Sequence, residues 1–397
     1  MKGLFGRKRG KDDFIPLCIP EMGGNEWKYL KECLDTNFVS SVGPFVDRFE
    51  EAVARYVKRK YAVATVNGTA ALHISLLVSG IVPDDEVLVS TLTFIAPVNA
   101  VRYVGAFPVF IDAEKDFWQM DTRKVIDFIE KRCAYRKGAL INVETGRTVR
   151  AIMPVHILGH PVDMDPILEI AEKYNLIVIE DATESLGAQY KGKMTGSLGE
   201  IACFSFNGNK IITTGGGGMI VTDNEKLARR AKYLTTQAKD DPVEYIHNEI
   251  GYNFRLTNIQ AALGCAQMER LDRYIEKKKY IADIYTGALK DLPGITPLGE
   301  ADWAWSIFWM YTILLDEGAF GIDSRTLLNR LAKKNIQTRP LWQPIHLSPA
   351  HRGATASDCS VSEYLYKTGL TLPCSVAITD SEIERVIDQI QSHHRNK

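Results

Sequence analysis

The stretch AIMPVHILGHPVDMDPILEIAEKYNLIVIED, residues 151–181, decides the fold class of this chain. It begins with an apolar run at 151–157 and ends with another at 176–181, both with the length and Val/Ile content of buried strands. Between them, PILEIAEKYN (166–175) has the apolar spacing of a helix. A strand, a helix and a second strand in this order predict parallel strands joined by a helix.

Similar runs extend the pattern on both sides of this stretch. Strand-like segments are YAVAT (61–65), EVLVS (86–90), PVFID (108–112), IACFSF (201–206) and GMIVTD (218–223). Residues 26–58 are expected to form two helices separated by a loop at 40–44. Short strands alternating with helices indicate an α/β fold with a mainly parallel, buried sheet.

The pattern changes after the basic segment 269–292, which is expected to form a helix that Pro293-Gly294 ends. It is followed by one or two strands at 305–315, a helix at 325–335 and a closing helix at 381–394. We therefore predict a large α/β domain over residues 14–268 and a smaller C-terminal α+β domain over residues 269–397.

Composition limits the classes of function. A formal net charge of −1 gives no reason to expect nucleic acid as the main partner. No apolar run reaches about 18 residues, so no membrane span is expected. The seven cysteines form no CxxC pair, which favours a reducing, cytoplasmic location, and no metal site is expected. Residues 1–13 are basic without an apolar segment behind them, so we expect a solvated leader, with an anion-binding or membrane-surface patch as the alternative.

Three polar positions follow predicted strands, where ligands bind in open α/β sheets. Residues 67–69 (NGT) lie between a strand and a helix, an arrangement that suits a phosphate but also a plain capped helix. Asp181 ends the run at 176–181, where it either meets a ligand or caps the next helix. Lys210 lies between two apolar strands, where a desolvated amine can act as a nucleophile, although a solvated loop lysine is the commoner case.

Pyridoxal phosphate needs these three features together: an anchor for its phosphate, a carboxylate for its pyridine nitrogen and an amine that holds its aldehyde. The glycine run at 215–218 does not complete a phosphate-binding loop of the Gly-Lys-Ser/Thr type, and a strand is expected after it. The chain also lacks GxGxxG after its first strand, which argues against a nicotinamide-dependent oxidoreductase. A non-catalytic scaffold would leave Lys210 and Asp181 unexplained.

The chain resembles the DegT/DnrJ/EryC1/StrS family of sugar aminotransferases from about residue 16 to the C-terminus. The motifs that carry the resemblance are GTAALH (68–73), STLTFIAPVNAV (90–101), MPVHILGHPVDMD (153–165), VIEDATESLGA (178–188), FSFNGNKIITTGGGGM (204–219) and GYNFRLTNIQAALG (251–264). The resemblance implies the aspartate-aminotransferase fold (fold type I), pyridoxal 5′-phosphate as cofactor, a nucleotide-linked keto sugar as substrate and L-glutamate as amino donor.

The resemblance also implies roles for single residues. Lys210 would hold the cofactor covalently and move protons, and Asp181 would pair with the pyridine nitrogen. The other cofactor residues would be Gly68, Thr69 and Ser205 at the phosphate, Phe94 on the ring face and Glu184 near the 3′-oxygen. Asn253 would reach the phosphate from a neighbouring subunit, which implies a homodimer with shared active sites.

The substrate is expected to meet His156 and three residues of the smaller domain, Arg339, Trp342 and His346. Arg339 could bind the diphosphate with its guanidinium fork, whereas Trp342 could instead be a core residue.

Residues 207–218 and 338–346 resemble the branch that aminates UDP-linked 4-keto-6-deoxy-N-acetylhexosamines for surface glycans or nonulosonic acids, the LegC and bacillosamine types. The alternatives are an aminotransferase of the GDP-perosamine synthase type, acting on GDP-4-keto-6-deoxymannose, and a sugar dehydratase that uses the same cofactor. Some related dehydratases carry histidine in place of the lysine, so Lys210 favours transamination.

Overall fold

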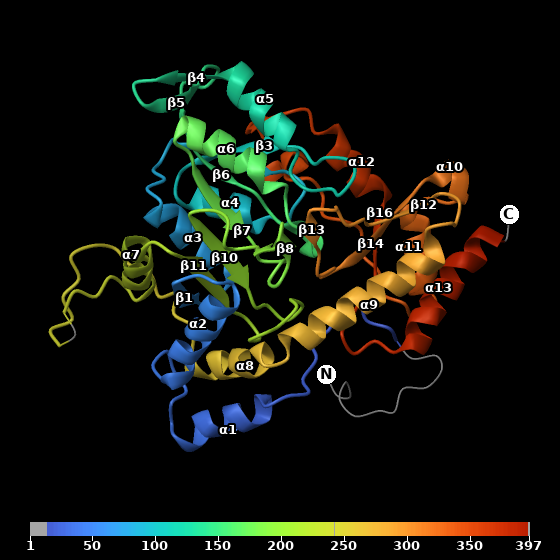
Figure 1. Ribbon diagram of the computed structural model, residues 1–397, viewed down its shortest axis with the longest axis horizontal. Helices are drawn as coiled ribbons and strands as arrows, with labels where there is room; N and C mark the ends of the chain where they lie inside the picture. The colour runs from blue at the N-terminus through green and yellow to red at the C-terminus, as the bar shows by residue number, and fades with distance from the viewer. Residues whose placement is uncertain (1–13, 242, 396–397) are drawn as a thin grey trace.

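The computed structural model describes residues 14–241 and 243–395, so the predicted leader at 1–13 lies outside the described residues. Within them, the centre is a ten-stranded sheet (Figure 1). Its main path runs in the spatial order β1 (Tyr61–Thr65), β11 (Gly218–Thr222), β10 (Ile201–Ser205), β7 (Ile177–Asp181), β6 (Thr148–Met153), β2 (Glu86–Ser90), β3 (Phe107–Ile111) and β15 (Thr355–Ala356). From β10 to β15 every neighbour pairs in parallel, whereas β11 pairs antiparallel with both β1 and β10. The prediction of a mainly parallel sheet is confirmed.

Alternate residues of the central strands enter two separate hydrophobic cores. In β2, Val87 and Val89 lie in one core and Leu88 lies in the other. In β7, Ile179 and Val178 divide in the same way. The sheet is therefore covered on both faces, which explains why its strands are apolar throughout rather than alternating with polar residues.

Each core is closed by its own set of helices. The first core contains apolar residues of α2 (Pro44–Tyr56), α3 (Gly68–Val78), α4 (Ala96–Tyr103) and α8 (Asn258–Met268). The second is closed by α5 (Thr122–Arg132) and α6 (Met164–Tyr174). Because α1 (Glu26–Asp35) and α2 are separated by a loop, the prediction of two helices within 26–58 is confirmed.

The apolar run at 151–157 forms less of a strand than its pattern predicts. The strand β6 ends at Met153, and Pro154 follows, which has no N–H to continue the pairing. Only an isolated bridge from Val155 to Asp181 continues the line of the sheet. The chain then turns through Leu158, whose φ is 59°, and this turn brings residues 156–160 underneath the end of β7.

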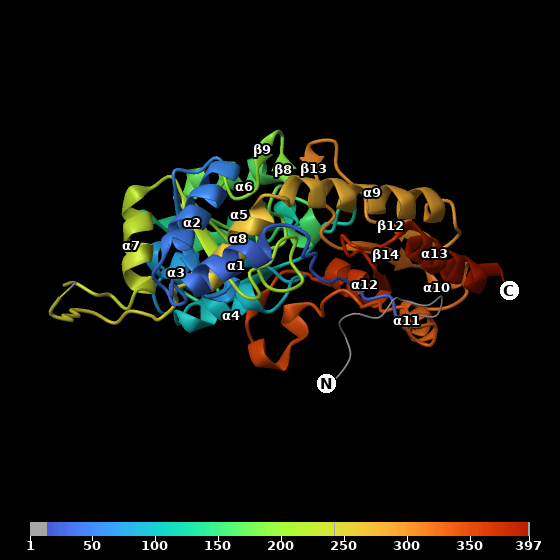
Figure 2. The same cartoon turned by 90° about the horizontal axis from the view of Figure 1, so that it is seen from below.

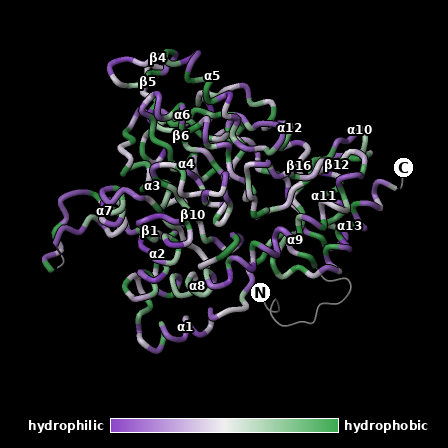
Figure 3. The backbone as a smooth tube through the Cα atoms, viewed as in Figure 1, coloured by the Kyte–Doolittle hydropathy of each residue, from purple (hydrophilic) through white to green (hydrophobic). Residues whose placement is uncertain are grey.

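The C-terminal part is built around a long helix, α9 (Leu271–Leu289), as the segment 269–292 predicts. Figures 1 and 2 show α9 leading from α8 toward a small antiparallel sheet. The order of that sheet is β12 (Ile295–Pro297), β14 (Tyr311–Leu315) and β16 (Gly369–Leu372), beside α11 (Ser324–Ala332) and α13 (Asp380–Arg395). Hydrophobic and hydrophilic residues alternate along α9 and α13, as expected for helices with one face on a core (Figure 3).

The two predicted domains exchange segments, so residue 268 does not separate them cleanly. The strand β15 belongs to the C-terminal part but pairs with β3 of the large sheet. Conversely, the N-terminal segment 14–19 joins the C-terminal part: Ile15 pairs with Ile336, and the Cys374 N–H donates to the Leu17 carbonyl at 2.8 Å. These pairings use backbone groups in very short segments, which leave no periodic pattern in the sequence.

None of the helices in the described ranges is both long and apolar enough to cross a membrane.

We expect the N-terminal segment to contribute to the stability of the C-terminal part. Ile15 is 1 % exposed, whereas Ile19 is 38 % exposed. Replacing Ile15 with alanine should lower the free energy of unfolding by about 2–5 kcal/mol, because it empties a buried site. Urea unfolding followed by circular dichroism measures this change. Ile19→Ala is the matched control and should shift the midpoint little; equal shifts would contradict the docking of this segment.

Candidate active site

A cavity of about 380 Å³ lies at the carboxyl ends of β7 and β10. Its volume is in the range of small-molecule sites. The sequence-predicted residues that line it are Gly68, Thr69, Phe94, Asp181, Glu184, Ser205, Lys210 and Trp342. A larger hollow of about 620 Å³ lies elsewhere, among charged side chains such as Glu114, Arg123 and Lys124, and contains none of the predicted residues. We therefore take the smaller cavity as the candidate site.

One end of the cavity is the N-terminus of α3. The residue that caps this helix is Asn67 and not Thr69, because the Asn67 Oδ1 accepts the Ala70 N–H at 2.8 Å. The first N–H groups of a helix have no partner inside it and carry the positive end of the helix dipole. A Cβ on Gly68 would lie 2.9 Å from the Ser205 Cβ, so glycine is required for α3 to approach β10. Together, these groups form a cradle for an anion.

A second side of the cavity is the carboxylate of Asp181, at the last position of β7. It is 1 % exposed and its Oδ1 accepts the Thr183 N–H at 3.1 Å. No helix follows directly, so the alternative that Asp181 caps one is excluded. Burial raises the pKa of Asp181, and hydrogen bonds from Thr183 and the attraction of Lys210 offset only part of that effect. A cation placed against it, such as a protonated ring nitrogen, would relieve this desolvation.

The third side is Lys210, on the loop between β10 and β11. Its side chain is 13 % exposed, and its Nζ lies 3.6 Å from the Glu184 Oε1 and 4.2 Å from the centre of the Trp309 ring. The Glu184 Oε2 accepts the Leu158 N–H at 2.9 Å. Burial raises the pKa of Glu184 to about 7, because the attraction of Lys210 offsets only part of the effect of burial. The amine is thus held between a carboxyl group that can exchange a proton and an aromatic face.

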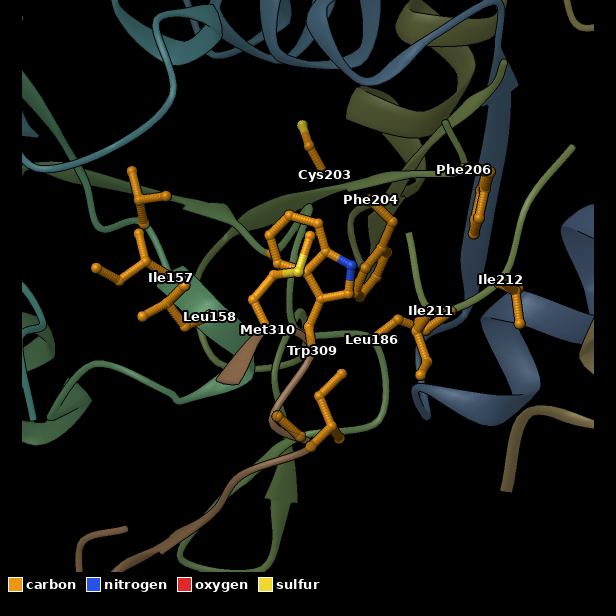
Figure 4. Packing of buried hydrophobic residues seen from close by; sticks show 14 of the residues in the cluster. Ile157, Leu158, Leu186, Cys203, Phe204, Phe206, Ile211, Ile212, Trp309 and Met310 are labelled. Atoms are coloured by element: carbon orange, nitrogen blue, oxygen red, sulfur yellow. The ribbon is translucent and has the colours of Figure 1, made fainter. Parts of the chain in front are cut away.

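Aromatic side chains form the remaining walls. Phe94 lies on the loop between β2 and α4 and is 56 % exposed at the cavity, where its ring can cover a flat ligand. Trp342 enters from the C-terminal part. Trp309 is fixed by its Nε1–H, which donates to the Asn209 carbonyl at 2.8 Å. Figure 4 shows the indole of Trp309 with Met310 and Phe204 around it.

His156 and His346 do not line the cavity, and the prediction that His156 meets the substrate is wrong because that residue is enclosed by the protein. His156 is fully buried: its Nε2 pairs with the Glu180 Oε2 at 3.1 Å, and its Nδ1 accepts the Val162 N–H at 3.0 Å. Both ring nitrogens are therefore occupied within the protein. His346 bonds to Thr91 at 2.8 Å through Nδ1 and to Glu363 at 3.1 Å through Nε2, and neither partner lines the cavity. A contact between His346 and the substrate stays a prediction.

Arg339 and Asn253 are exposed and do not line the cavity of this chain. The Arg339 backbone pairs with Thr371, and its guanidinium donates to the Thr338 carbonyl at 3.2 Å. Asn253 forms an isolated bridge with Thr236. The roles predicted for Arg339 and Asn253 therefore require a ligand or a second chain that reaches them.

Several residues that line the cavity are not among those predicted from the sequence: Thr183, Asn207, Asn209 and Trp309. Thr183 and the two asparagines stand inside motifs that were recognised, and their distance of one to three residues from Asp181 or Lys210 was an available signal. Trp309 offered no such signal. It stands in an apolar run about 100 residues after Lys210, where a tryptophan is normally a core residue.

The three sides of the cavity fit pyridoxal phosphate, which has a phosphate, a ring nitrogen and an aldehyde. No cluster of side chains that could hold a metal ion is found in the part of the chain that the structure describes. The fold and the site thus define an α/β enzyme that depends on pyridoxal phosphate. The chain belongs to the DegT/DnrJ/EryC1/StrS aminotransferase family, whose sequence pattern matches residues 20–391.

Known relatives match nearly the whole chain. A GDP-perosamine synthase from Caulobacter vibrioides is 42 % identical over 374 residues, 94 % of this chain and 96 % of that protein. The putative pyridoxal phosphate-dependent aminotransferase EpsN from Bacillus subtilis is 40 % identical over 378 residues, 94 % of each chain. The crystal structure of a DegT DnrJ EryC1 StrS aminotransferase from Brucella abortus superposes with a TM-score of 0.85 at 27 % identity, covering 93 % of this chain and 95 % of that one. The protein is a sugar aminotransferase.

The raised pKa of Glu184 predicts a pH dependence of stability in the cofactor-free protein. The ordinary pKa of a glutamate is 4.5, and that of Glu184 in the folded protein is about 7. At pH values between these two, the folded protein binds more protons than the unfolded chain. The contribution of Glu184 to the free energy of unfolding is therefore fully present below pH 4.5. It is lost as the pH rises through 7, which lowers the free energy of unfolding by up to about 3 kcal/mol.

Glu184→Gln should remove this loss. The unfolding free energy of the wild type, relative to the variant, should fall between pH 5 and pH 8 in urea titrations. Exposed Glu172 serves as the control, since Glu172→Gln should leave the profile unchanged. Parallel profiles for Glu184→Gln and the wild type would contradict the assignment.

Proposed function

We propose that this enzyme transfers the amino group of L-glutamate to the C4 keto group of GDP-4-keto-6-deoxymannose, as a step in polysaccharide synthesis. The observation that carries the aminotransferase chemistry is the cavity in which Lys210, Asp181 and the N-terminus of α3 meet. The choice of the GDP-linked sugar rests on the 42 % identical relative that is named GDP-perosamine synthase. A UDP-linked 4-keto-6-deoxy-N-acetylhexosamine is the second candidate, favoured by the motifs at 207–218 and 338–346.

When bound, pyridoxal phosphate supplies an electron-withdrawing ring that stabilises negative charge on the carbon being deprotonated. The N–H groups of Gly68 and Thr69, with the Ser205 hydroxyl, would hold its phosphate. Asp181 would keep its ring nitrogen protonated, because a buried carboxylate gains most from a partner that carries a proton. Phe94 would cover the face of the ring and keep water away from it.

Lys210 performs the proton transfers in this proposal. Its Nζ would take the proton from the α-carbon of the amino acid, and in the opposite direction it would return a proton to C4 of the sugar. Glu184, 3.6 Å from that Nζ, keeps the amine oriented and can exchange a proton with it. Trp342 and Arg339 would act on the sugar nucleotide, Trp342 from the cavity wall and Arg339 from the exposed surface of the C-terminal part.

We propose further that two copies of the chain complete each other's sites. The chain at residues 239–241 and 243–250 projects away from the body of the protein beside α7 (Glu225–Thr235) in both views (Figures 1 and 2). It carries exposed apolar side chains, among them Tyr245 at 76 % and Ile250 at 83 %. Exposed apolar side chains of this kind support an interaction surface. Asn253 lies shortly after this segment and is exposed, as a residue that reaches into a neighbour's site must be.

All seven cysteines are free, which supports a reducing, cytoplasmic location.

The function is tested by the absorption spectrum of the purified protein loaded with pyridoxal phosphate. Adding L-glutamate should shift a band at about 410–430 nm to about 330 nm, as the amino group passes to the cofactor. Adding the GDP-linked 4-keto sugar afterwards should restore the first band and yield an amino sugar detectable by mass spectrometry. Lys210→Ala should show neither shift while keeping the circular dichroism of the wild type.

The same assay distinguishes the substrates. If only the UDP-linked sugar restores the band, the substrate is the UDP-linked sugar and not the GDP-linked one. If the band shifts with glutamate but neither sugar restores it, the reaction with glutamate would be supported and both proposed sugar substrates would be refuted.

A complementation experiment tests the shared site. Lys210→Ala and Asn253→Ala should each be inactive, but refolding them together should recover about a quarter of wild-type activity, because half the dimers are mixed and each has one intact site. A mixture of Lys210→Ala with Asp181→Ala is the control and should recover nothing, because both residues belong to the same chain's site. No recovery with Asn253→Ala would place Asn253 in the site of its own chain.

A further inference from the structure

A buried lysine lies between two cysteines behind the active site. Lys278, on α9, is 2 % exposed. Its Nζ donates to the Trp309 carbonyl at 2.7 Å and to the Cys374 carbonyl at 2.5 Å. The sulfur atoms of Cys18 and Cys374 lie 3.7 Å and 3.6 Å from the same Nζ. None of these three side chains lines the catalytic cavity.

The charge of Lys278 requires compensation. A buried ammonium group is strongly destabilising unless a negative charge lies close to it. Among the described residues, no carboxylate forms an ion pair with Lys278, so the neighbouring sulfurs are the groups that can carry the charge. A hydrogen bond from the Cys18 thiol and the attraction of Lys278 lower the pKa of Cys374, while the same hydrogen bond and burial raise the pKa of Cys18. Both shifts favour a thiolate at Cys374 and a thiol at Cys18.

The backbone holds the two cysteines side by side. The Cys374 N–H donates to the carbonyl of Leu17, which precedes Cys18. On the other side of Cys18, the Ile19 N–H donates to the Ser375 hydroxyl at 2.9 Å. Cys18 is half-buried, so a small oxidant can approach from its side, whereas Cys374 is 1 % exposed. Adjacent backbones and converging side chains are what a disulfide requires.

We propose that Cys18 and Cys374 form a peroxide-sensitive pair, in which Lys278 holds the Cys374 thiolate and oxidation joins the two sulfurs in a disulfide. The thiolate attacks one oxygen of hydrogen peroxide, which gives a sulfenic acid and hydroxide. That hydroxide takes the proton of the Cys18 thiol and becomes water. The Cys18 thiolate then attacks the Cys374 sulfur, forming the S–S bond and expelling a second hydroxide, which takes a proton from solvent. The two cysteines lose two electrons and the peroxide gains them.

The pair is connected to the catalytic lysine through one carbonyl group. The Cys18 sulfur lies 3.5 Å from the Asn209 carbonyl oxygen, which also accepts the Trp309 Nε1–H. Asn209 precedes Lys210, and the Lys210 Nζ lies over the Trp309 ring. Oxidation removes the thiol hydrogen from Cys18 and draws its sulfur toward Cys374. We therefore expect it to slow transamination several-fold, with recovery on addition of dithiothreitol.

Differential alkylation of the holoenzyme followed by peptide mass spectrometry tests the proposal directly. Treatment with low hydrogen peroxide should produce a Cys18–Cys374 peptide pair, two hydrogens lighter than the separate thiols, before the other cysteines react. The thermal midpoint should rise by several degrees, because the bond closes a very long loop in the unfolded chain. Lys278→Met should slow formation of the bond about tenfold or more, because it removes the charge that stabilises the thiolate.

Cys133→Ser is the matched control, because Cys133 is also half-buried and burial raises its pKa to about 12. It should leave the peroxide response unchanged, whereas Cys18→Ser and Cys374→Ser should each abolish the linked peptide. Alkylation of Cys18 and Cys374 at the rates of the other cysteines after peroxide would overturn the proposal. A cross-link that joins either cysteine to Lys278 would also overturn it. A disulfide that forms without any change in transamination rate would overturn the connection to Lys210.

Discussion

The parallel register of β7 against β10 is the constraint on which the site depends. It pairs Asp181, the last residue of β7, with Cys203 in the interior of β10. β10 therefore extends two residues further, and Ser205 and the loop that carries Lys210 begin beyond the Asp181 carboxylate. Because both strands run in the same direction, their side chains arrive at one edge of the sheet. A shift of one residue would turn Asp181 to the opposite face.

The charge next to Asp181 is balanced by a buried network. Burial opposes the ionisation of Glu180, but His156 and backbone N–H groups outweigh this effect and lower the pKa of Glu180. The Glu180 carboxylate accepts the N–H groups of Leu198 and Gly199 at 2.7 Å, and Arg59 lies 3.9 Å away. Neighbouring positions of one strand thus hold carboxylates with opposite pKa shifts. The charge of Glu180 is compensated by groups of the protein, whereas Asp181 lines the cavity, where a cationic ligand group would compensate its charge.

The C-terminal part is connected to catalysis by contacts that cross the predicted domain boundary. Trp309 lies over Lys210, Trp342 lines the cavity, and β15 extends the large sheet. The N-terminal segment contributes Cys18, which reaches the carbonyl that precedes Lys210. Changes in the packing of this part can therefore alter the position of the lysine without touching the cofactor site.

The sequence by itself determined the sheet and the chemical core of the site. The apolar runs at 61–65 and 86–90 have the same bounds as the strands β1 and β2. Asp181 and Lys210 are recognisable in the sequence because they stand at or after the ends of such runs. Tertiary structure alone decided that His156 is enclosed and that Trp309 reaches the lysine. It also decided that residues 14–19 dock on the C-terminal part. The physical reason is that the contacts of Trp309 and of residues 14–19 join segments about 100 residues or more apart. His156 is enclosed by single hydrogen bonds to Glu180 and Val162, and neither kind of contact leaves a period in the sequence.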